Sequence, residues 1–226
     1  MINTLDDYVW RSLPEWGDFV TNPNLQKKVD QNGQFLPFYG NTTVFLLDGK
    51  TKQTLHQLQE ELYSAAGWML AQKLDPGTFH MTLHDLVNSP EVGGALMRRM
   101  SEAESGAKAL LGQWCGQPPL HMQTTWLFNM VNTSIVLGLK PADEDSWHRL
   151  DEMYTALEAV VPLGYSLTPH ITMAYYRSGS YSQQELDILR NALHPVELTV
   201  ELSMENLALQ NFRNMNTYMP SDMPIV

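Results

Sequence analysis

The chain has 226 residues, of which 43% are hydrophobic and 10% are aromatic. This length and composition are typical of a globular protein with a sizeable core, and they exclude a disordered chain. The formal net charge is −11, with 14 Lys and Arg residues against 25 Asp and Glu residues. Binding of duplex nucleic acid is therefore not expected, because it depends on many contacts of Lys and Arg with phosphates. A small phosphorylated ligand in a local pocket stays open.

The sequence also bears on location and on thiol chemistry. The first residues carry no basic region followed by an apolar run, and no segment reaches the apolar length of a membrane span. Cys115 is the single cysteine, so neither an internal disulfide nor a cysteine metal site is expected. We therefore predict a cytoplasmic protein without membrane contact, and we leave its oligomeric state open.

Turn residues and apolar periodicity divide the chain into an extension and one domain. Residues 1–34 are expected to form an N-terminal extension that packs on the core, and residues 35–226 a single domain. The Pro-containing segment 117–119 is the best boundary between two halves, which we place at about 35–118 and 119–226. The first half is expected to contain strands over 42–48 and 78–86 and helices over 51–72 and 91–113. The second half is expected to contain strands over 120–130, 133–139, 168–176, 196–202 and 206–218 and helices over 141–161 and 182–193.

Two of these strands carry the same motif, a histidine followed two residues later by a threonine. The motifs are His80-Met81-Thr82-Leu83 and His170-Ile171-Thr172-Met173. Because side chains of a strand alternate between its faces, each histidine shares a face with its threonine, while the apolar residues share the other. Such a strand suits a position between a core and a cleft.

The spacing of the motifs indicates an internal duplication. Thr42-Thr43 opens a strand, a helix follows, and His80 comes 38 positions after Thr42. Thr133-Ser134 opens a later strand, a helix follows, and His170 comes 37 positions after Thr133. Two copies of strand, helix and histidine strand predict two pseudo-symmetric lobes, whose histidine strands meet at a central cleft.

Two histidines on opposite walls of a cleft are suited to proton transfer in the cleavage of a phosphodiester. With ordinary pKa values near ~6.5, one imidazole can be neutral and the other charged around neutral pH. One of His80 and His170 would activate a water or hydroxyl, and the other would protonate the departing oxygen. The hydroxyls of Thr82 and Thr172 can donate hydrogen bonds to the phosphoryl oxygens. This chemistry requires neither a metal nor a cofactor, and we expect neither.

A zinc motif is the competing interpretation of the first histidine strand. The helical zinc motif also places two histidines four residues apart, as are His80 and His84. It needs a glutamate after the first histidine, however, and Met81 stands there in a segment that favours a strand. We therefore expect no metal site.

With both motifs and their spacing in view, the chain resembles the 2H phosphoesterase superfamily, which includes the bacterial LigT-like 2′-5′ RNA ligases and cyclic nucleotide phosphodiesterases. The segment Leu36-Pro37-Phe38-Tyr39-Gly40-Asn41-Thr42-Thr43 further resembles a little-characterised bacterial branch. The resemblance implies an α+β fold in which bilobal, duplicated strand-helix-strand units line a central cleft with antiparallel sheets. It implies metal-independent hydrolysis of a small cyclic phosphate or nucleotide-like phosphodiester of the 2′,3′-cyclic or 2′-5′ type. His80 and His170 would be the acid and base.

Five further residues are candidate substrate contacts. By strand alternation, His84 and Tyr176 share a face with the histidine and threonine of their motifs, where many LigT-like relatives carry a basic residue nearby. Tyr39 could stack on a base, and Asn41 and Thr43 lie at the mouth of the first strand. Core packing is the open alternative for Tyr39, and a surface position is the open alternative for His84. For the whole protein, a non-catalytic nucleotide-binding module and an RNA-end enzyme are the alternative functions.

Overall fold

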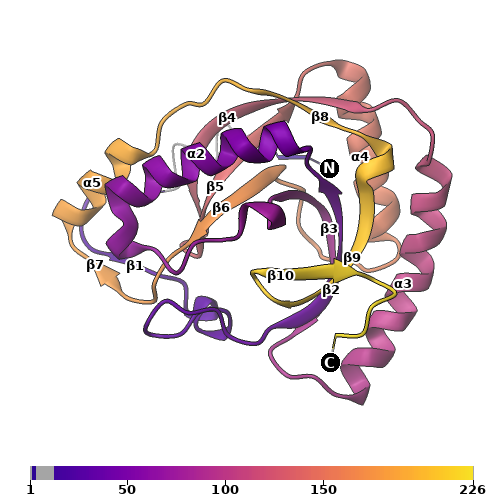
Figure 1. Cartoon of the computed structure of the whole chain (residues 1–226), viewed down its shortest axis with the longest axis horizontal. Coiled ribbons are helices and arrows are strands. Elements are labelled where there is room, and N and C mark those ends of the chain that lie inside the picture. The colour runs from indigo at the N-terminus through magenta and orange to yellow at the C-terminus, as the bar shows by residue number, and fades with distance from the viewer. Residues whose placement is uncertain (1, 4–12, 226) are drawn as a thin grey trace.

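The computed structural model describes residues 2–3 and 13–225. Its centre is a curled, fully antiparallel sheet in the order β10-β9-β2-β3-β6-β5-β4-β8, and β1 and β7 form a small second sheet (Figure 1). The strands span β1 Phe19–Val20, β2 Tyr39–Leu46, β3 His80–Ser89, β4 Leu120–Met130, β5 Ser134–Pro141, β6 His170–Tyr175, β7 Ser180–Tyr181, β8 Thr199–Leu202, β9 Leu207–Asn214 and β10 Thr217–Pro220.

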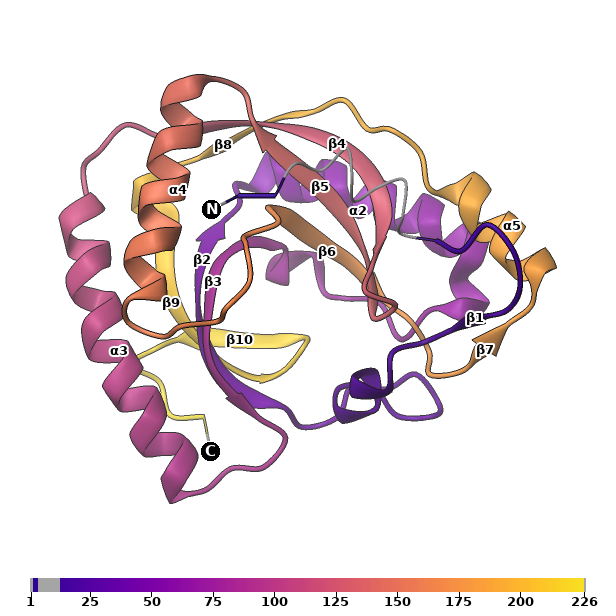
Figure 2. The ribbon, with the colours of Figure 1, turned by 180° about the vertical axis from the view of Figure 1, so that it is seen from behind.

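Helices lie on both sides of this curled sheet. They are α2 Gly49–Ala66, α3 Gly94–Trp114, α4 Glu144–Glu158 and α5 Gln183–Ala192. From both directions of view, α2 lies near α5 on one side, and α3 lies beside α4 on the other (Figures 1 and 2). Three of them begin at a side chain that accepts a hydrogen bond from the first turn, which satisfies an otherwise free backbone donor. These caps are Asp48, Asp143 and Ser182.

The two halves of the sheet meet at the histidine strands. Strands β3 and β6 are neighbours, with Met81 opposite Ile171, and both of these side chains are fully buried in the core. The expected α+β fold with antiparallel strands is confirmed, and the two sets of strands are joined into one continuous sheet. The histidine motifs therefore lie side by side at the centre of the molecule.

The sheet does not follow the order of the sequence. Strand β9 pairs with β2, and β10 pairs with β9, so residues 207–220 lie next to the strands of the first half. The division at about residue 118 thus separates the two repeats in the sequence, but it does not separate the two halves of the sheet. The half with β2 and β3 also contains the C-terminal strands β9 and β10. Among the described residues, no helix combines the length and the apolar character needed to cross a membrane.

The described part of the N-terminal segment packs on the core. Phe19, Leu25 and Val29 are buried in the same apolar cluster as the central strands. Strand β1 pairs with β7, which follows the second histidine strand. Residues 4–12 of the expected extension lie outside the described residues.

Candidate active site

Both histidine motifs open onto one cavity of about 510 Å³. His80, Thr82, His170 and Thr172 all line it. Since Met81 and Ile171 are opposite each other in an antiparallel pair, the same register places His80 opposite Thr172 and Thr82 opposite His170. The four side chains therefore form a compact set on one face of two adjacent strands.

The two imidazoles are held in the same way. In each, Nδ1 lies 2.6 Å from the carbonyl oxygen two residues earlier, that of Thr78 for His80 and that of Thr168 for His170. A carbonyl oxygen can only accept, so Nδ1 carries the proton and Nε2 of a neutral ring is left as an acceptor. This duplicated contact gives both rings the tautomer that a general base needs.

Burial in the cavity wall keeps both rings neutral in the free protein. Desolvation is the main cause that lowers the pKa of His80 to about 4; the Thr78 carbonyl and the Asp85 carboxylate oppose it, and His170 and Lys52 add to it. Desolvation likewise lowers the pKa of His170, against the Thr168 carbonyl and Asp85. A bound phosphate would favour the charged form of either ring, because opposite charges attract. A proton can thus enter the site together with the ligand.

A bulge in each histidine strand changes which side chains face the cavity. Leu83 has no partner on β2, and Met173 has none on β5. An extra residue reverses the alternation of a strand beyond it. As a result Asp85 and Tyr175 line the cavity, whereas Tyr176, expected there from simple alternation, is fully buried on the other side.

Lys28 and Asp85 give the cavity its charged groups. Among the described residues that line the cavity, they are the only ones with a formal charge when the histidines are neutral. The Lys28 ammonium lies 5.0 Å from the ring centre of Phe38 and 5.9 Å from that of Tyr175, within the range of a cation–π contact. Lys28 comes from the N-terminal segment, in which the sequence offers no signal for a site residue.

Phenol groups form much of the remaining wall. The ring of Tyr218, in β10, lies 4.8 Å from the His80 ring, edge to face. Tyr154 and Tyr165 also line the cavity, from α4 and the segment that precedes β6. Tyr165 is 58% exposed, yet partial desolvation and the charges of Asp85 and Glu158 raise its pKa to about 12, so its hydroxyl stays a hydrogen-bond donor at neutral pH. None of these tyrosines belongs to a motif that the sequence would mark.

His84 reaches the cavity wall, but its ring is engaged elsewhere. It is fully buried, its Nε2 lies 3.1 Å from Oε1 of Glu158, and its ring packs on Tyr154 at 5.1 Å. The same Glu158 oxygen accepts a hydrogen bond from the backbone of Leu163. His84 therefore ties β3 to the end of α4 and to the segment that leads to the second motif.

Three other expected substrate contacts lie outside the cavity, as Tyr176 does. The amide of Asn41 donates to the Met100 carbonyl of α3 and accepts from the Val87 backbone, so its position is structural. The Thr43 hydroxyl donates to the His84 carbonyl, beside the bulge at Leu83. Tyr39 is half-buried and packs against the core. The expectation that these three side chains line the cavity is therefore wrong. Hydrogen bonds to the backbone hold Asn41 and Thr43, and packing against the core holds Tyr39.

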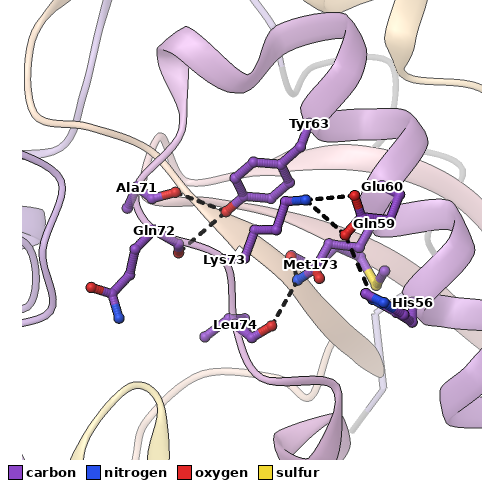
Figure 3. Close-up of polar contacts among 9 residues, drawn as sticks. All are labelled: His56, Gln59, Glu60, Tyr63, Ala71, Gln72, Lys73, Leu74 and Met173. Carbon is purple, nitrogen blue, oxygen red and sulfur yellow. Dashed lines mark hydrogen bonds and ion pairs between the residues drawn. The ribbon is translucent and has the colours of Figure 1, made fainter.

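Gln59 of α2 connects the approaches to both motifs. It is fully buried, and its Nε2 donates to the Leu74 carbonyl at 3.2 Å and to the Met173 carbonyl at 3.0 Å (Figure 3). Leu74 precedes the first histidine strand, and Met173 is the bulged residue of the second. One buried amide thus supports the backbone that sets the direction of Tyr175.

The same segment has further contacts nearer the surface. The Tyr63 hydroxyl donates to the Ala71 carbonyl at 2.9 Å, and the Lys73 ammonium forms an ion pair with Glu60 at 2.6 Å (Figure 3). Because both partners of this ion pair are almost half exposed, it adds little stability. Among the described residues, no group of three or more His, Cys, Asp or Glu side chains is placed to hold a metal ion.

No family model matches the chain, and no curated protein matches its sequence. Solved structures do match. A conserved protein of unknown function from Agrobacterium tumefaciens str. C58, ATU0111, is 17% identical over 89% of this chain and 92% of its own, with a TM-score of 0.62. TT0787 of Thermus thermophilus is 13% identical over 80% of this chain and 94% of its own, with a TM-score of 0.54.

The third structure is that of Escherichia coli LigT complexed with ATP. It is 14% identical over 81% of this chain and 95% of its own, with a TM-score of 0.50. Similarity at such low identity is a similarity of fold, and it spans most of both chains. The chain therefore has the LigT-like fold that the paired histidine motifs predict.

Proposed function

We propose that this protein is a metal-independent phosphoesterase that hydrolyses a small cyclic phosphate or nucleotide-like phosphodiester, of the 2′,3′-cyclic or 2′-5′ type. The observation that carries the proposal is that both histidines and both threonines of the motifs, His80, Thr82, His170 and Thr172, line one cavity from two neighbouring strands. The fold supports it, because LigT has the same fold and has been crystallised with a nucleotide, ATP.

In the proposed reaction the two histidines act at opposite ends of the phosphate. A neutral imidazole takes a proton from water through its Nε2, and the oxygen of that water attacks phosphorus. The other imidazole, charged once the phosphate is bound, gives its proton to the departing oxygen. The bond from phosphorus to that oxygen breaks as the new one forms. The Thr82 and Thr172 hydroxyls donate hydrogen bonds to the remaining phosphoryl oxygens, where negative charge increases in the transition state.

The test is a turnover screen with excess chelator, using 2′,3′-cyclic nucleotides and 2′-5′-linked oligonucleotides. We expect turnover that resists the chelator and that falls by roughly 10²–10⁴-fold in either His80→Ala or His170→Ala, the usual range for loss of an acid or base. His148→Ala is the control, because His148 is exposed on α4 and does not line the cavity.

Two results would count against the proposal. Turnover that the chelator abolishes would mean that the chemistry depends on a metal. Binding of nucleotides without any turnover would favour a non-catalytic nucleotide-binding module on the same fold.

An RNA-end enzyme is the weaker alternative. Lys28 is the one formally charged cation among the described residues that line the cavity, whereas an RNA strand brings many phosphates.

A further inference from the structure

The carboxylate of Asp85 is an unusual neighbour for a phosphate. The bulge at Leu83 turns Asp85 into the cavity, where its Oδ1 lies 3.3 Å from the Thr42 hydroxyl, which shares its proton between this carboxylate and the His84 carbonyl at 3.1 Å. This contact comes from β2, the strand next to β3, so the carboxylate is held from a second element. It is part of the wall and does not swing freely on the surface.

The electrostatic influence of Asp85 extends across the whole cavity. Burial is the main cause of the pKa shifts around it, lowering the pKa of His80 and His170 and raising that of Tyr175 and Tyr218. The charge of Asp85 opposes the shift of the two histidines and adds to that of the two tyrosines. These four side chains come from β3, β6 and β10, which are different sides of the cavity. A negative charge bound anywhere among them therefore lies within reach of Asp85.

The positive charge available to balance a ligand is small. Lys28 is the single formally charged cation among the described lining residues, and Asp85 offsets it, so the wall is neutral when the histidines are neutral. One phosphodiester charge can be balanced by a histidine that becomes protonated. A further phosphate, with its additional negative charge, would find no second cation among the described lining residues and would be repelled by Asp85; Lys52 acts on His80 from outside the cavity wall.

We propose that Asp85 restricts this cavity to phosphodiesters with a single negative charge, which is the charge of the phosphate that lies between the two histidines. Such a substrate presents an uncharged hydrogen-bond donor, for example a sugar hydroxyl, to the Asp85 carboxylate. Substrates with an additional phosphomonoester are disfavoured. This inference rests on the proposed function, because it takes His80 and His170 to flank the phosphate.

The experiment measures binding, so that it does not depend on turnover. The probes are the 2′-(methyl phosphate) diester of 3′-deoxyadenosine, called the monophosphate below, and the same diester with an added 5′-phosphate, called the bisphosphate below. Both contain one singly charged diester, and they differ by one phosphomonoester. Their dissociation constants are measured by calorimetry for the wild type, Asp85→Asn and Asp222→Asn. Asp85→Asn removes the charge and keeps an acceptor for Thr42. Asp222→Asn makes the same change of net charge at an exposed position that does not line the cavity.

We expect the wild type to bind the monophosphate at least tenfold more tightly than the bisphosphate. In Asp85→Asn this ratio should fall at least fivefold, and in Asp222→Asn it should stay as in the wild type. If Asp85→Asn does not fold, Asp85→Ser removes the same charge and takes its place.

The inference is overturned if the ratio is the same with and without the Asp85 carboxylate, if the wild type prefers the bisphosphate, or if the wild type binds neither compound. Failure of the proposed function would show separately, as absent or chelator-sensitive turnover of 2′,3′-cyclic nucleotides by the wild type.

Discussion

The buried amide of Gln59 allows a prediction whose size follows from its contacts. Replacing Gln59 with Met keeps a long unbranched side chain but removes the group that donates to the Leu74 and Met173 carbonyls. The amide oxygen Oε1 has no hydrogen-bond partner among the described residues, so the two donated bonds are the polar contribution of this side chain. Each such bond contributes about 1 kcal/mol net. We therefore expect Gln59→Met to lose about 2 kcal/mol of the free energy of unfolding.

Urea unfolding followed by circular dichroism measures this loss directly, and thermal unfolding should give a Tm lower by roughly 4–8 °C for a chain of this size. The matched control is Glu60→Gln, one residue further along α2, which removes the exposed ion pair with Lys73 and should cost less than ~1 kcal/mol. If Gln59→Met is no less stable than Glu60→Gln, the argument from burial is refuted.

Two further predictions concern a histidine and a glycine. The pKa of His80 is ~6.5 in the unfolded chain and about 4 in the folded protein, so between these pH values only the unfolded chain binds a proton on His80. The free energy of unfolding should therefore drop as the pH falls from ~6.5 towards about 4. Urea unfolding at several pH values should show a shallower drop in His80→Gln, and an unchanged slope would contradict the assignment. Gly40→Ala should lose at least ~3 kcal/mol, because an added Cβ would collide with the Val87 carbonyl oxygen and the Phe212 ring. Gly49→Ala, where an added Cβ meets nothing within 4 Å, is the control in thermal unfolding, and equal Tm values for the two variants would contradict this prediction.

Much of the fold could be predicted because its elements carry local signals. Apolar periodicity places α3, α4, α5 and most of the described strands within three residues of their observed bounds, but it extends α2 six residues too far and predicts one strand over 206–218, where β9 and β10 lie. The matched spacing of the two motifs predicts that the histidine strands meet. Pairing of β9 with β2 was not predictable in this way. It joins residues about 165 positions apart, as Phe45 and Leu207 show, and no local pattern specifies such a partner.

The candidate site was only partly predictable, for two physical reasons. Strand alternation correctly groups His80 with Thr82 and His170 with Thr172 on the cavity, but it fails beyond each bulge, because a bulge depends on the neighbouring strand. Lys28 and Tyr218 were missed for another reason. They reach the cavity from segments distant in sequence and carry no motif of their own.

Residues 36–43 form a segment that has a largely structural role. Phe38 stacks on Phe212 at 6.2 Å, Gly40 allows close contact with β3 and β9, and Asn41 binds the backbone of α3. Its polar residues suggested a ligand, yet their hydrogen bonds go to the protein itself. Phe38 and Thr42 also line the cavity, so the segment both fixes how β2 packs between its neighbours and forms part of the cavity wall.

The position of β9 and β10 has a consequence for the order in which the chain folds. Met215 and Tyr218 are translated after all the other described residues that line the cavity. The half of the sheet that begins with β2 stays open on one edge until these strands emerge, and closing so long a loop is slow. The strands of the first repeat therefore have all their partners, and the cavity all its described lining residues, only after residues 207–220 have been synthesised.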